Sequence, residues 1–372
     1  MVRQETTGFE YDAWIASACM PSSLIRQILV RFGDSAACHE AFQRKDPDIH
    51  GMIPPRFCRI LQENASAEQL KVYAGRMKEH DIRVIRQEDP HYPADLSEID
   101  DPPPILFYQG DLSCLSRRII AMVGSRAASY AGLKATSALA RDLSRRGVEI
   151  VSGLACGIDA AAHQGCIEGG SPTIAVTGCG LDRVYPSDNR MLRDRILERG
   201  GILLSEYAPG EKPAGWHFPV RNRIITGIAR ALVLMEARIR SGSMTSVQHA
   251  LDQGRDVFVY PGDPAMEQFE GNHRLLREGA IYFTGAEDIL EDLGWLDNPF
   301  EVRHNIDCPA ADVPLSPEQA LIAGALKPGT LSFEELLKHT GLDPSVLMGG
   351  LTVLQISGII EALPGKQYRL KQ

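Results

Sequence analysis

Three short segments of the chain are made of groups with which proteins commonly hold phosphate oxygens. They are Gly124-Ser125-Arg126, Arg221-Asn222-Arg223 and Ser241-Gly242-Ser243. Glycine lets backbone N–H groups approach a ligand closely, and the planar guanidinium of arginine offers paired donors to a phosphate. Any one such segment is more often an ordinary turn than a site, so the interpretation depends on whether the fold brings them together.

The elements between residues 118 and 290 predict that the fold brings these three segments together. Glycines recur at Gly153 and Gly157 and in Gly178-Cys179-Gly180, and these segments follow short apolar runs. The runs are IIAMV, VEIVS, TIAVTG, GILLSE, ALVLMEA and DVFVYPG, with amphipathic stretches between them. Buried parallel strands alternating with helices have this pattern, which predicts an α/β fold with a doubly wound, mostly parallel sheet. Since ligands bind at the carboxyl ends of such strands, we expect one shared anion-binding groove.

Motifs for other ligands are missing from the sequence. It has no G-x-G-x-x-G followed by an acid, no P-loop, no H-E-x-x-H and no G-x-S-x-G. We therefore predict no cofactor, no metal ion and no catalytic residue. Asp159 and His163 are four positions apart, and we interpret them as a paired structural group rather than metal ligands.

The overall charge at first argues against a polyanionic ligand, because 48 acidic residues outnumber 39 basic ones and the net charge is −9. What binds a polyanion is a local basic surface. Five arginines lie between positions 221 and 240 with Glu236 as the one acid among them: Arg221, Arg223, Arg230, Arg238 and Arg240. This stretch is predicted to be locally cationic.

Changes in composition divide the 372 residues into four parts. Short helices broken by prolines predict a small helical domain at residues 1–75, and the sheet domain follows at 76–295. An acidic, proline-dotted linker is expected at 296–315. Three helices and a terminal hairpin near Leu363-Pro364-Gly365 predict a winged-helix domain at 316–372.

The winged-helix domain is predicted to be a protein-interaction or regulatory module rather than a second DNA-binding site. Residues 316–372 hold five basic and five acidic side chains, and the candidate recognition helix between Asp343 and Gly358 has no Lys or Arg. The chain shows no targeting or membrane-spanning segment, so we expect a cytoplasmic protein that does not bind a membrane. Its eight cysteines are scattered without a C-x-x-C pair, which favours reduced thiols.

The order and spacing of the motifs resemble one family. AMVGSR, SGLACGIDAAAH, GCGLDRVYPSDN, SEY, FPVRNRIITG, EARIRSGSMTS, GRDVFVYPG and GNHRLLREGA are similar, in this order, to the core of the DNA-processing protein A (DprA, or Smf) family. The resemblance implies an extended Rossmann-like domain, preceded by a helical domain similar to a SAM or helix-hairpin-helix domain. It also implies a homodimer, formed through the Rossmann-like domain, that binds single-stranded DNA without catalysis. It also implies loading of the RecA recombinase onto incoming DNA in natural transformation, that is, in competence and recombination.

By motif position, the resemblance assigns phosphate contacts to the three segments named first. Two departures matter. The N-terminal domain has Cys19-Met20-Pro21-Ser22 where relatives often carry a glycine-rich hairpin, so DNA contact is not predicted there. Ser246 stands where relatives often have a threonine, three positions after the Ser241-Gly242-Ser243 segment, and it retains the hydroxyl group.

Two alternatives stay open at the level of sequence. Nucleotide phosphoribohydrolases share a similar core, but their P-G-G-x-G-T-x-x-E motif is replaced here by Pro261-Gly262-Asp263-Pro264-Ala265. The second alternative is a scaffold protein whose groove no longer binds a ligand. Four aromatic residues are placed in loops where they could stack on bases or pack in the core: Tyr185, Tyr207, Trp216 and Phe218.

Overall fold

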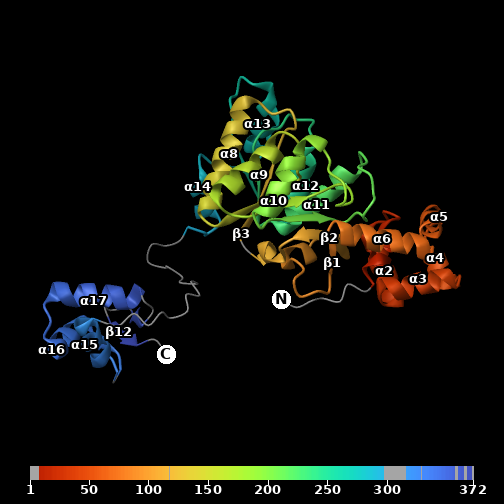
Figure 1. Ribbon diagram of the computed structural model, residues 1–372. Coiled ribbons are helices and arrows are strands. Elements are labelled where there is room, and N and C mark those ends of the chain that lie inside the picture. The colour runs from red at the N-terminus through yellow and green to blue at the C-terminus, as the bar shows by residue number, and fades with distance from the viewer. Residues whose placement is uncertain are drawn as a thin grey trace. The chain divides into compact units, whose positions relative to one another are not determined.

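The computed structural model describes residues 8–116, 118–296, 316–327, 329–356, 359–363 and 367–370. The chain forms two compact units, Met1–Leu296 and Asp297–Gln372 (Figure 1). Apart from Leu296, the predicted linker lies outside the described residues.

The larger unit is built on a nine-stranded sheet with the strand order β1-β2-β6-β5-β4-β3-β7-β8-β9. Seven neighbouring strands from β6 to β9 run parallel, and β2 pairs antiparallel with both β6 and β1. The strands are β1 (Arg83–Arg86), β2 (Ile105–Gly110), β3 (Arg118–Val123), β4 (Val148–Ser152), β5 (Thr173–Val176), β6 (Ile202–Ser205), β7 (Ala231–Leu234), β8 (Asp256–Val259) and β9 (Ile281–Tyr282). All six predicted apolar runs form strands, and the doubly wound, mostly parallel sheet is confirmed.

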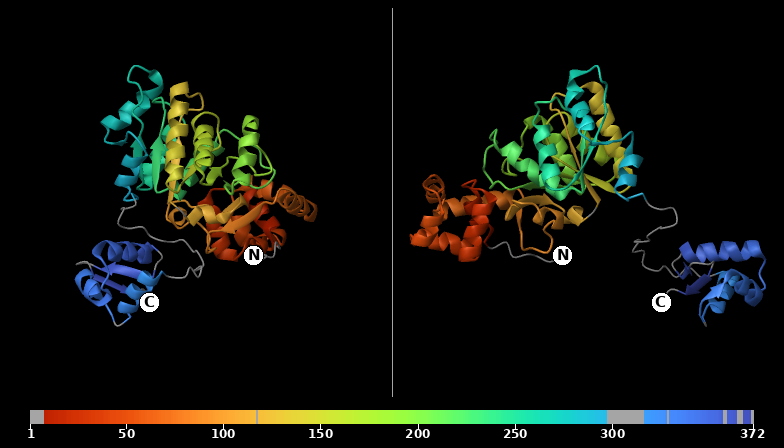
Figure 2. Two further views of the ribbon diagram at one scale, coloured as in Figure 1. Left: turned by 60° about the vertical axis from the view of Figure 1, so that its left-hand side comes forward. Right: turned by 180° about the vertical axis from the view of Figure 1, so that it is seen from behind.

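Helices cover both faces of the sheet because the strands are apolar on both sides (Figure 2). In β3, Ile119 and Ala121 pack under α11 and α12, whereas Ile120 and Met122 pack under α8 and α9. The helices that belong to the sheet are α7 (Ala94–Ser97), α8 (Tyr130–Arg145), α9 (Ile158–Gly169), α10 (Arg190–Glu198), α11 (His217–Ile228), α12 (Ser243–Asp252), α13 (Glu270–Arg277) and α14 (Ala286–Asp292). Burial on both faces explains why these strands lack an alternating pattern.

The N-terminal helices pack onto the β1 and β2 side of the same unit (Figure 1). They are α1 (Phe9–Ala16), α2 (Ser22–Phe32), α3 (Ser35–Gln43), α4 (Pro47–Met52), α5 (Pro55–Glu63) and α6 (Ala67–Glu79). The fully buried Trp14 lies in one core with Phe107 of β2 and Ala175 of β5. Arg86 of β1 donates to the buried carboxylate of Asp12 in α1 at 2.6 Å. The predicted helical region therefore exists, but it shares its core with the sheet.

The smaller unit has the predicted winged-helix elements. Its helices are α15 (Pro317–Ala325), α16 (Phe333–Thr340) and α17 (Pro344–Ile356), and its sheet has the order β10-β12-β11, formed by Leu331–Ser332, Gln367–Leu370 and Ile360–Leu363. Leu336, Leu351 and Ile360 belong to a core of its own. The strands of the predicted hairpin pair as expected, while its turn at Pro364-Gly365 lies outside the described residues.

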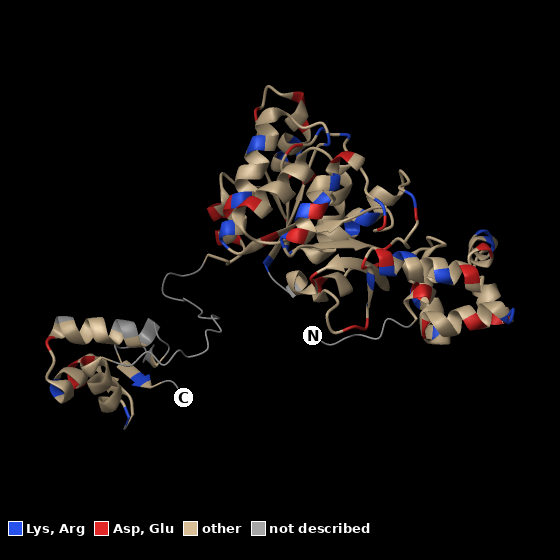
Figure 3. Ribbon diagram, in the orientation of Figure 1, with Lys and Arg blue, Asp and Glu red and all other residues tan. Residues whose placement is uncertain are grey.

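Charged residues of both signs are interspersed over the larger unit (Figure 3). The predicted cationic stretch is divided by the fold. Arg221 and Arg223 are buried, Arg238 forms an exposed ion pair with Glu267 at 3.4 Å, and Arg230 and Arg240 are exposed. The five arginines do not form one basic surface, because α11 turns the first two inward.

Candidate functional site

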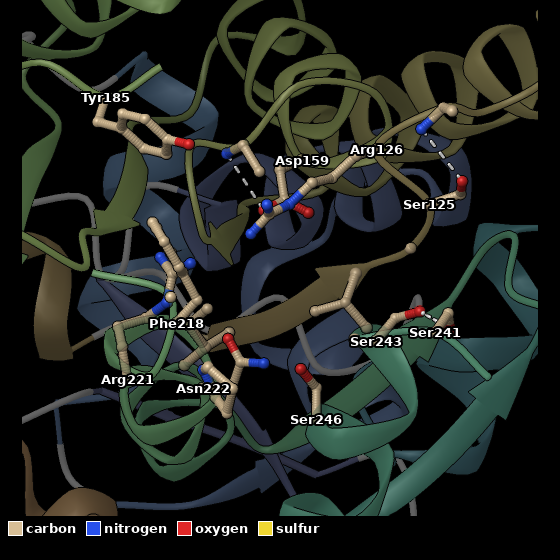
Figure 4. Close-up of a pocket in the computed structure, with 18 of the residues that line it drawn as sticks. Ser125, Arg126, Asp159, Tyr185, Phe218, Arg221, Asn222, Ser241, Ser243 and Ser246 are labelled. Carbon is tan, nitrogen blue, oxygen red and sulfur yellow. Dashed lines mark hydrogen bonds between the residues drawn. The ribbon is translucent and has the colours of Figure 1, made fainter. Parts of the chain in front are cut away.

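A pocket of about 600 Å³ lies where the strand order reverses, beside the ends of β3 and β7 (Figure 4). Sheets of this type bind ligands at this position. Its lining comes from the loops after β3, β4, β5 and β7, from the loop before α11, and from α9, α11 and the start of α12. The lining residues are Val123, Gly124, Ser125, Arg126, Ala127, Ala155, Asp159, Tyr185, Pro213, Gly215, Phe218, Pro219, Arg221, Asn222, Ile225, Ser241, Gly242, Ser243 and Ser246.

An exposed arginine and two aromatic rings lie at the mouth of the pocket. The guanidinium carbon of Arg126 is 5.0 Å from the centre of the Phe218 ring, a cation–π distance. Tyr185 lies beside Phe218, with ring centres 5.5 Å apart, and its side chain is 44% exposed. The arrangement offers a cation for a phosphate next to flat apolar surfaces on which a base can stack.

Arg221 supplies a second cation from within the wall of the pocket. Its guanidinium donates to the carbonyl oxygens of Gly153, at 2.8 Å, and Val176, and its Nε has no hydrogen-bond partner among the described residues. Burial lowers the pKa of Arg221 to about 10, although the nearby carboxylate of Asp159 opposes the shift. The side chain stays cationic at neutral pH while being held in one orientation.

Hydroxyl and amide groups line the side of the pocket across from Arg126 (Figure 4). The hydroxyl groups of Ser241 and Ser243 are 2.7 Å apart, and Ser246 follows one turn later in α12. The first turn of α12 contains no acidic residue, so its N-terminus retains the positive end of the helix dipole. The Asn222 side chain forms no hydrogen bond within the described part of the chain. These donors suit the oxygens of a phosphate or sugar.

Close packing explains the glycine that opens the first segment. A Cβ atom at Gly124 would lie 2.6 Å from Cγ1 of Ile158 and 3.0 Å from the carbonyl oxygen of Glu236. The backbone N–H of Ser125 donates to that same oxygen at 2.7 Å, and the carbonyl of Ser125 accepts from the N–H of Ile158. The turn after β3 is thus fixed between two neighbouring loops, which leaves Arg126 free to project.

The structure brings eight of the eleven predicted site residues into the lining of the pocket. They are Gly124, Ser125, Arg126, Arg221, Asn222, Ser241, Gly242 and Ser243. Gly153, Gly157 and Arg223 do not line it, and neither does Gly178-Cys179-Gly180.

The predicted role of Gly153 and Gly157 as phosphate donors needs correction. The N–H groups of Gly153 and Ala155 donate to the carboxylate of Asp159 at 3.1 and 3.3 Å, so the turn already holds an anion of its own. Gly157 begins α9 at a φ of +78°, and a Cβ there would collide with the backbone of Ser125 and Arg126. Both glycines serve internal packing.

Arg223 is also placed differently from the prediction. Its guanidinium donates to both carboxylate oxygens of Glu206, at 3.0 and 2.7 Å, and to the hydroxyl of Ser22 in α2 at 2.8 Å. The motif Phe218–Arg223 lies in α11 rather than in a loop at a strand end. On a helix, Asn222 and Arg223 face different directions, so one reaches the pocket and the other the N-terminal helices.

Asp159 and His163 do not form the pair that the sequence predicted. His163 hydrogen-bonds the hydroxyl of Thr173 through Nδ1 at 2.8 Å, whereas Asp159 accepts from the loop before its helix. Burial raises the pKa of Asp159, although Arg221 opposes the shift.

The pocket is moderately cationic. Arg126 and Arg221 face one carboxylate, Asp159, and the described lining contains no cysteine or histidine. It offers no ligand set for a transition metal. Among the described residues, no helix has the length and apolarity that crossing a bilayer requires.

Sequence reasoning gave little weight to several lining residues. Pro213 and Gly215 come from the loop before α11, which carries no phosphate-binding motif. Tyr185 and Phe218 were equally compatible with a core position, because an aromatic residue in a loop carries no signal of its exposure.

A Rossmann-like sheet with a pocket at its switch point defines a class of proteins that bind ligands at the carboxyl ends of their strands. Comparison with known proteins identifies the family within this class. A sequence model of the family described as DNA recombination-mediator protein A matches residues 83–294, and a model of the DprA winged helix domain matches residues 307–366. The chain belongs to the DNA recombination-mediator protein A (DprA/Smf) family.

Individual relatives support the same family membership. The chain is 47% identical to DNA processing protein DprA of Streptococcus pneumoniae over 204 residues, which cover 55% of this chain and 72% of that one. It is 35% identical to protein Smf of Escherichia coli over 294 residues, 78% of each chain.

Two solved structures are similar to this fold. The X-ray structure of DprA from Streptococcus pneumoniae superposes with a TM-score of 0.64 at 35% identity, covering 76% of this chain and 97% of that one. DNA processing protein A of Helicobacter pylori, described for its single-stranded DNA binding mode, superposes with a TM-score of 0.52 at 28% identity, covering 57% and 95%.

Proposed function

We propose that this protein binds single-stranded DNA in the pocket at the strand ends, without transforming it chemically. The observation that carries the proposal is the juxtaposition of Arg126 with the Phe218 and Tyr185 rings. A nucleotide presents a phosphate and a flat base, and unpaired DNA is held by cations that contact the backbone and aromatic rings that stack on bases.

The remaining lining supports binding over catalysis. Serine hydroxyl groups are present, but the described lining residues include no histidine or lysine that could act as a base. The one carboxylate, Asp159, is buried and accepts two backbone N–H groups. The segment Pro261–Ala265, where phosphoribohydrolases carry their motif, does not line the pocket. We infer that the pocket holds its ligand and releases it unchanged.

Family membership supports a wider role. We propose that the protein is cytoplasmic, protects incoming single strands and loads the RecA recombinase onto them in natural transformation. We further propose a homodimer formed through the sheet unit. The helix α17 has no Lys or Arg, so we assign the winged-helix unit to a protein contact rather than a second DNA contact.

The test is binding of a labelled single-stranded oligonucleotide, compared with duplex DNA, across a salt series, with native mass measured in parallel. Replacing Arg126 with Ala is expected to weaken binding to a similar extent for every sequence and to lower the salt slope by roughly one unit. The matched control is Arg238→Ala, which removes an exposed arginine outside the pocket lining. Equal slopes for wild type and Arg126→Ala would refute the assignment of the pocket.

A further inference from the structure

Three potential metal ligands from distant parts of the sequence meet outside the DNA pocket. They are Cys19 in the turn between α1 and α2, Glu211 in the loop after β6, and His217 at the start of α11. Their sulfur, carboxylate oxygen and imidazole nitrogen all lie within 4.8 Å of one another. Cysteine, histidine and glutamate are the side chains that bind Zn²⁺ in proteins.

The imidazole of His217 is oriented as in a metal ligand. Its Nδ1 is 3.0 Å from the carbonyl oxygen of Gly178. A carbonyl only accepts, so Nδ1 carries the proton and Nε2 keeps a free lone pair. The ring is held between Tyr207, stacked at 4.0 Å, and Trp216, edge-on at 4.1 Å. Metal-binding histidines usually donate their second nitrogen to such an oxygen, which fixes the tautomer.

The Glu211 carboxylate forms no ion pair among the described residues, although the charges of Arg183 and Lys212 act on it. A divalent ion bound to one thiolate, one carboxylate and one neutral imidazole gives a site with no net charge.

The separations of the three ligand atoms can be compared with those in a zinc site. A water molecule completes a tetrahedral set of three protein ligands. Ligands in a tetrahedral zinc site lie about 3.5 Å apart, since the bonds are about 2.0–2.3 Å long. The three ligand atoms lie within 4.8 Å of one another, so each side chain must move by a distance on the order of 1 Å to reach zinc-site spacing.

We propose that Cys19, Glu211 and His217 form a site for a divalent transition-metal ion, with Zn²⁺ as the best match. The thiolate disfavours Mg²⁺ and Ca²⁺, and the mixed sulfur, nitrogen and oxygen set in a tetrahedral arrangement favours Zn²⁺. On binding, the thiol proton of Cys19 leaves to solvent and the sulfur forms the bond to the metal. The ion ties the turn between α1 and α2 to the loop that precedes α11, the helix that carries Arg221 and Asn222.

The test uses the full chain, stripped of metal with a chelator and titrated with Zn²⁺ against a competing chromophoric chelator. One Zn²⁺ per chain is expected. C19S and E211Q should each weaken binding by about 10-fold or more, since each removes a charged ligand. The matched control is C58S, because Cys58 is also a partly buried thiol of the N-terminal helices but has neither Glu211 nor His217 beside it. C58S should bind Zn²⁺ as the wild type does.

Substitution with Co²⁺ gives a second measurement that reports directly on the sulfur bond. Wild type and C58S should show a thiolate-to-cobalt charge-transfer band, and C19S should not. The proposal is refuted if the stripped chain binds no Zn²⁺, or if C19S and E211Q bind it as tightly as wild type. Because E211Q alters a half-exposed side chain, it provides the test even if C19S misfolds. Binding of single-stranded DNA is measured in a separate assay, so a negative result for Zn²⁺ does not affect the proposal for the DNA pocket.

Discussion

Lowering the pH is expected to destabilise the protein through one buried imidazole, that of His163. The ring is fully buried in α9, the helix whose Asp159 lines the pocket together with Ala155 of the preceding turn. The hydroxyl of Thr173 donates to the carbonyl of Ile150, so it accepts from Nδ1 of His163. The second nitrogen, Nε2, has no hydrogen-bond partner in the described part of the chain. A proton on Nε2 would therefore be a buried donor with no acceptor.

The size of the effect follows from the pKa of this group. Burial lowers the pKa of His163 from 6.5 to about 3. Between these values the unfolded chain binds a proton that the folded chain does not, so stability falls as the pH decreases. At about pH 5, roughly 1.5 units below the unfolded pKa and at about 1.36 kcal/mol per unit, the loss is about 2 kcal/mol. At about pH 7 it is close to zero.

Urea unfolding of the wild type and of His163→Asn isolates this contribution. Asparagine retains an N–H donor for Thr173 but cannot be protonated, and its smaller volume costs a similar free energy at every pH. The stability advantage of the wild type should therefore shrink by about 2 kcal/mol between about pH 7 and pH 5. If that advantage were constant with pH, protonation of His163 would not be coupled to unfolding and the argument would fail.

Two other predictions concern the pocket and the smaller unit. Replacing Phe218 with Leu keeps an apolar side chain but removes the ring beside Arg126 and Tyr185, so affinity for single-stranded DNA should fall by about 1–3 kcal/mol with little change in the salt slope. A changed slope with unchanged affinity would contradict stacking at this position. Deleting residues 316–372 should leave most of the affinity intact in a gel-shift assay, because their bases and acids balance. Loss of most binding would assign DNA contact to the winged-helix unit.

The sequence determined the sheet and the part of the site that depends on topology. Six apolar runs were long enough to cross a sheet buried on both sides, and all six form strands. Parallel strands end at a common edge, so residues such as Ser125 and Ser243 meet in one pocket although they are far apart in the chain. Short elements escaped prediction, because β1 and β2 lie among prolines and charged residues and are defined by their partners.

Tertiary structure decided which similar residues face the ligand. Arg221 and Arg223 belong to one motif, but a helix rotates by about 100° per residue, so Arg221 reaches the pocket and Arg223 pairs with Glu206. Gly153 was predicted to bind a phosphate, yet the fold gives its N–H to Asp159. No local sequence pattern predicts that Cys19 and His217, which are far apart in the chain, lie close together. Composition and periodicity specify elements, whereas the direction of a side chain and its long-range partner depend on packing among all of them.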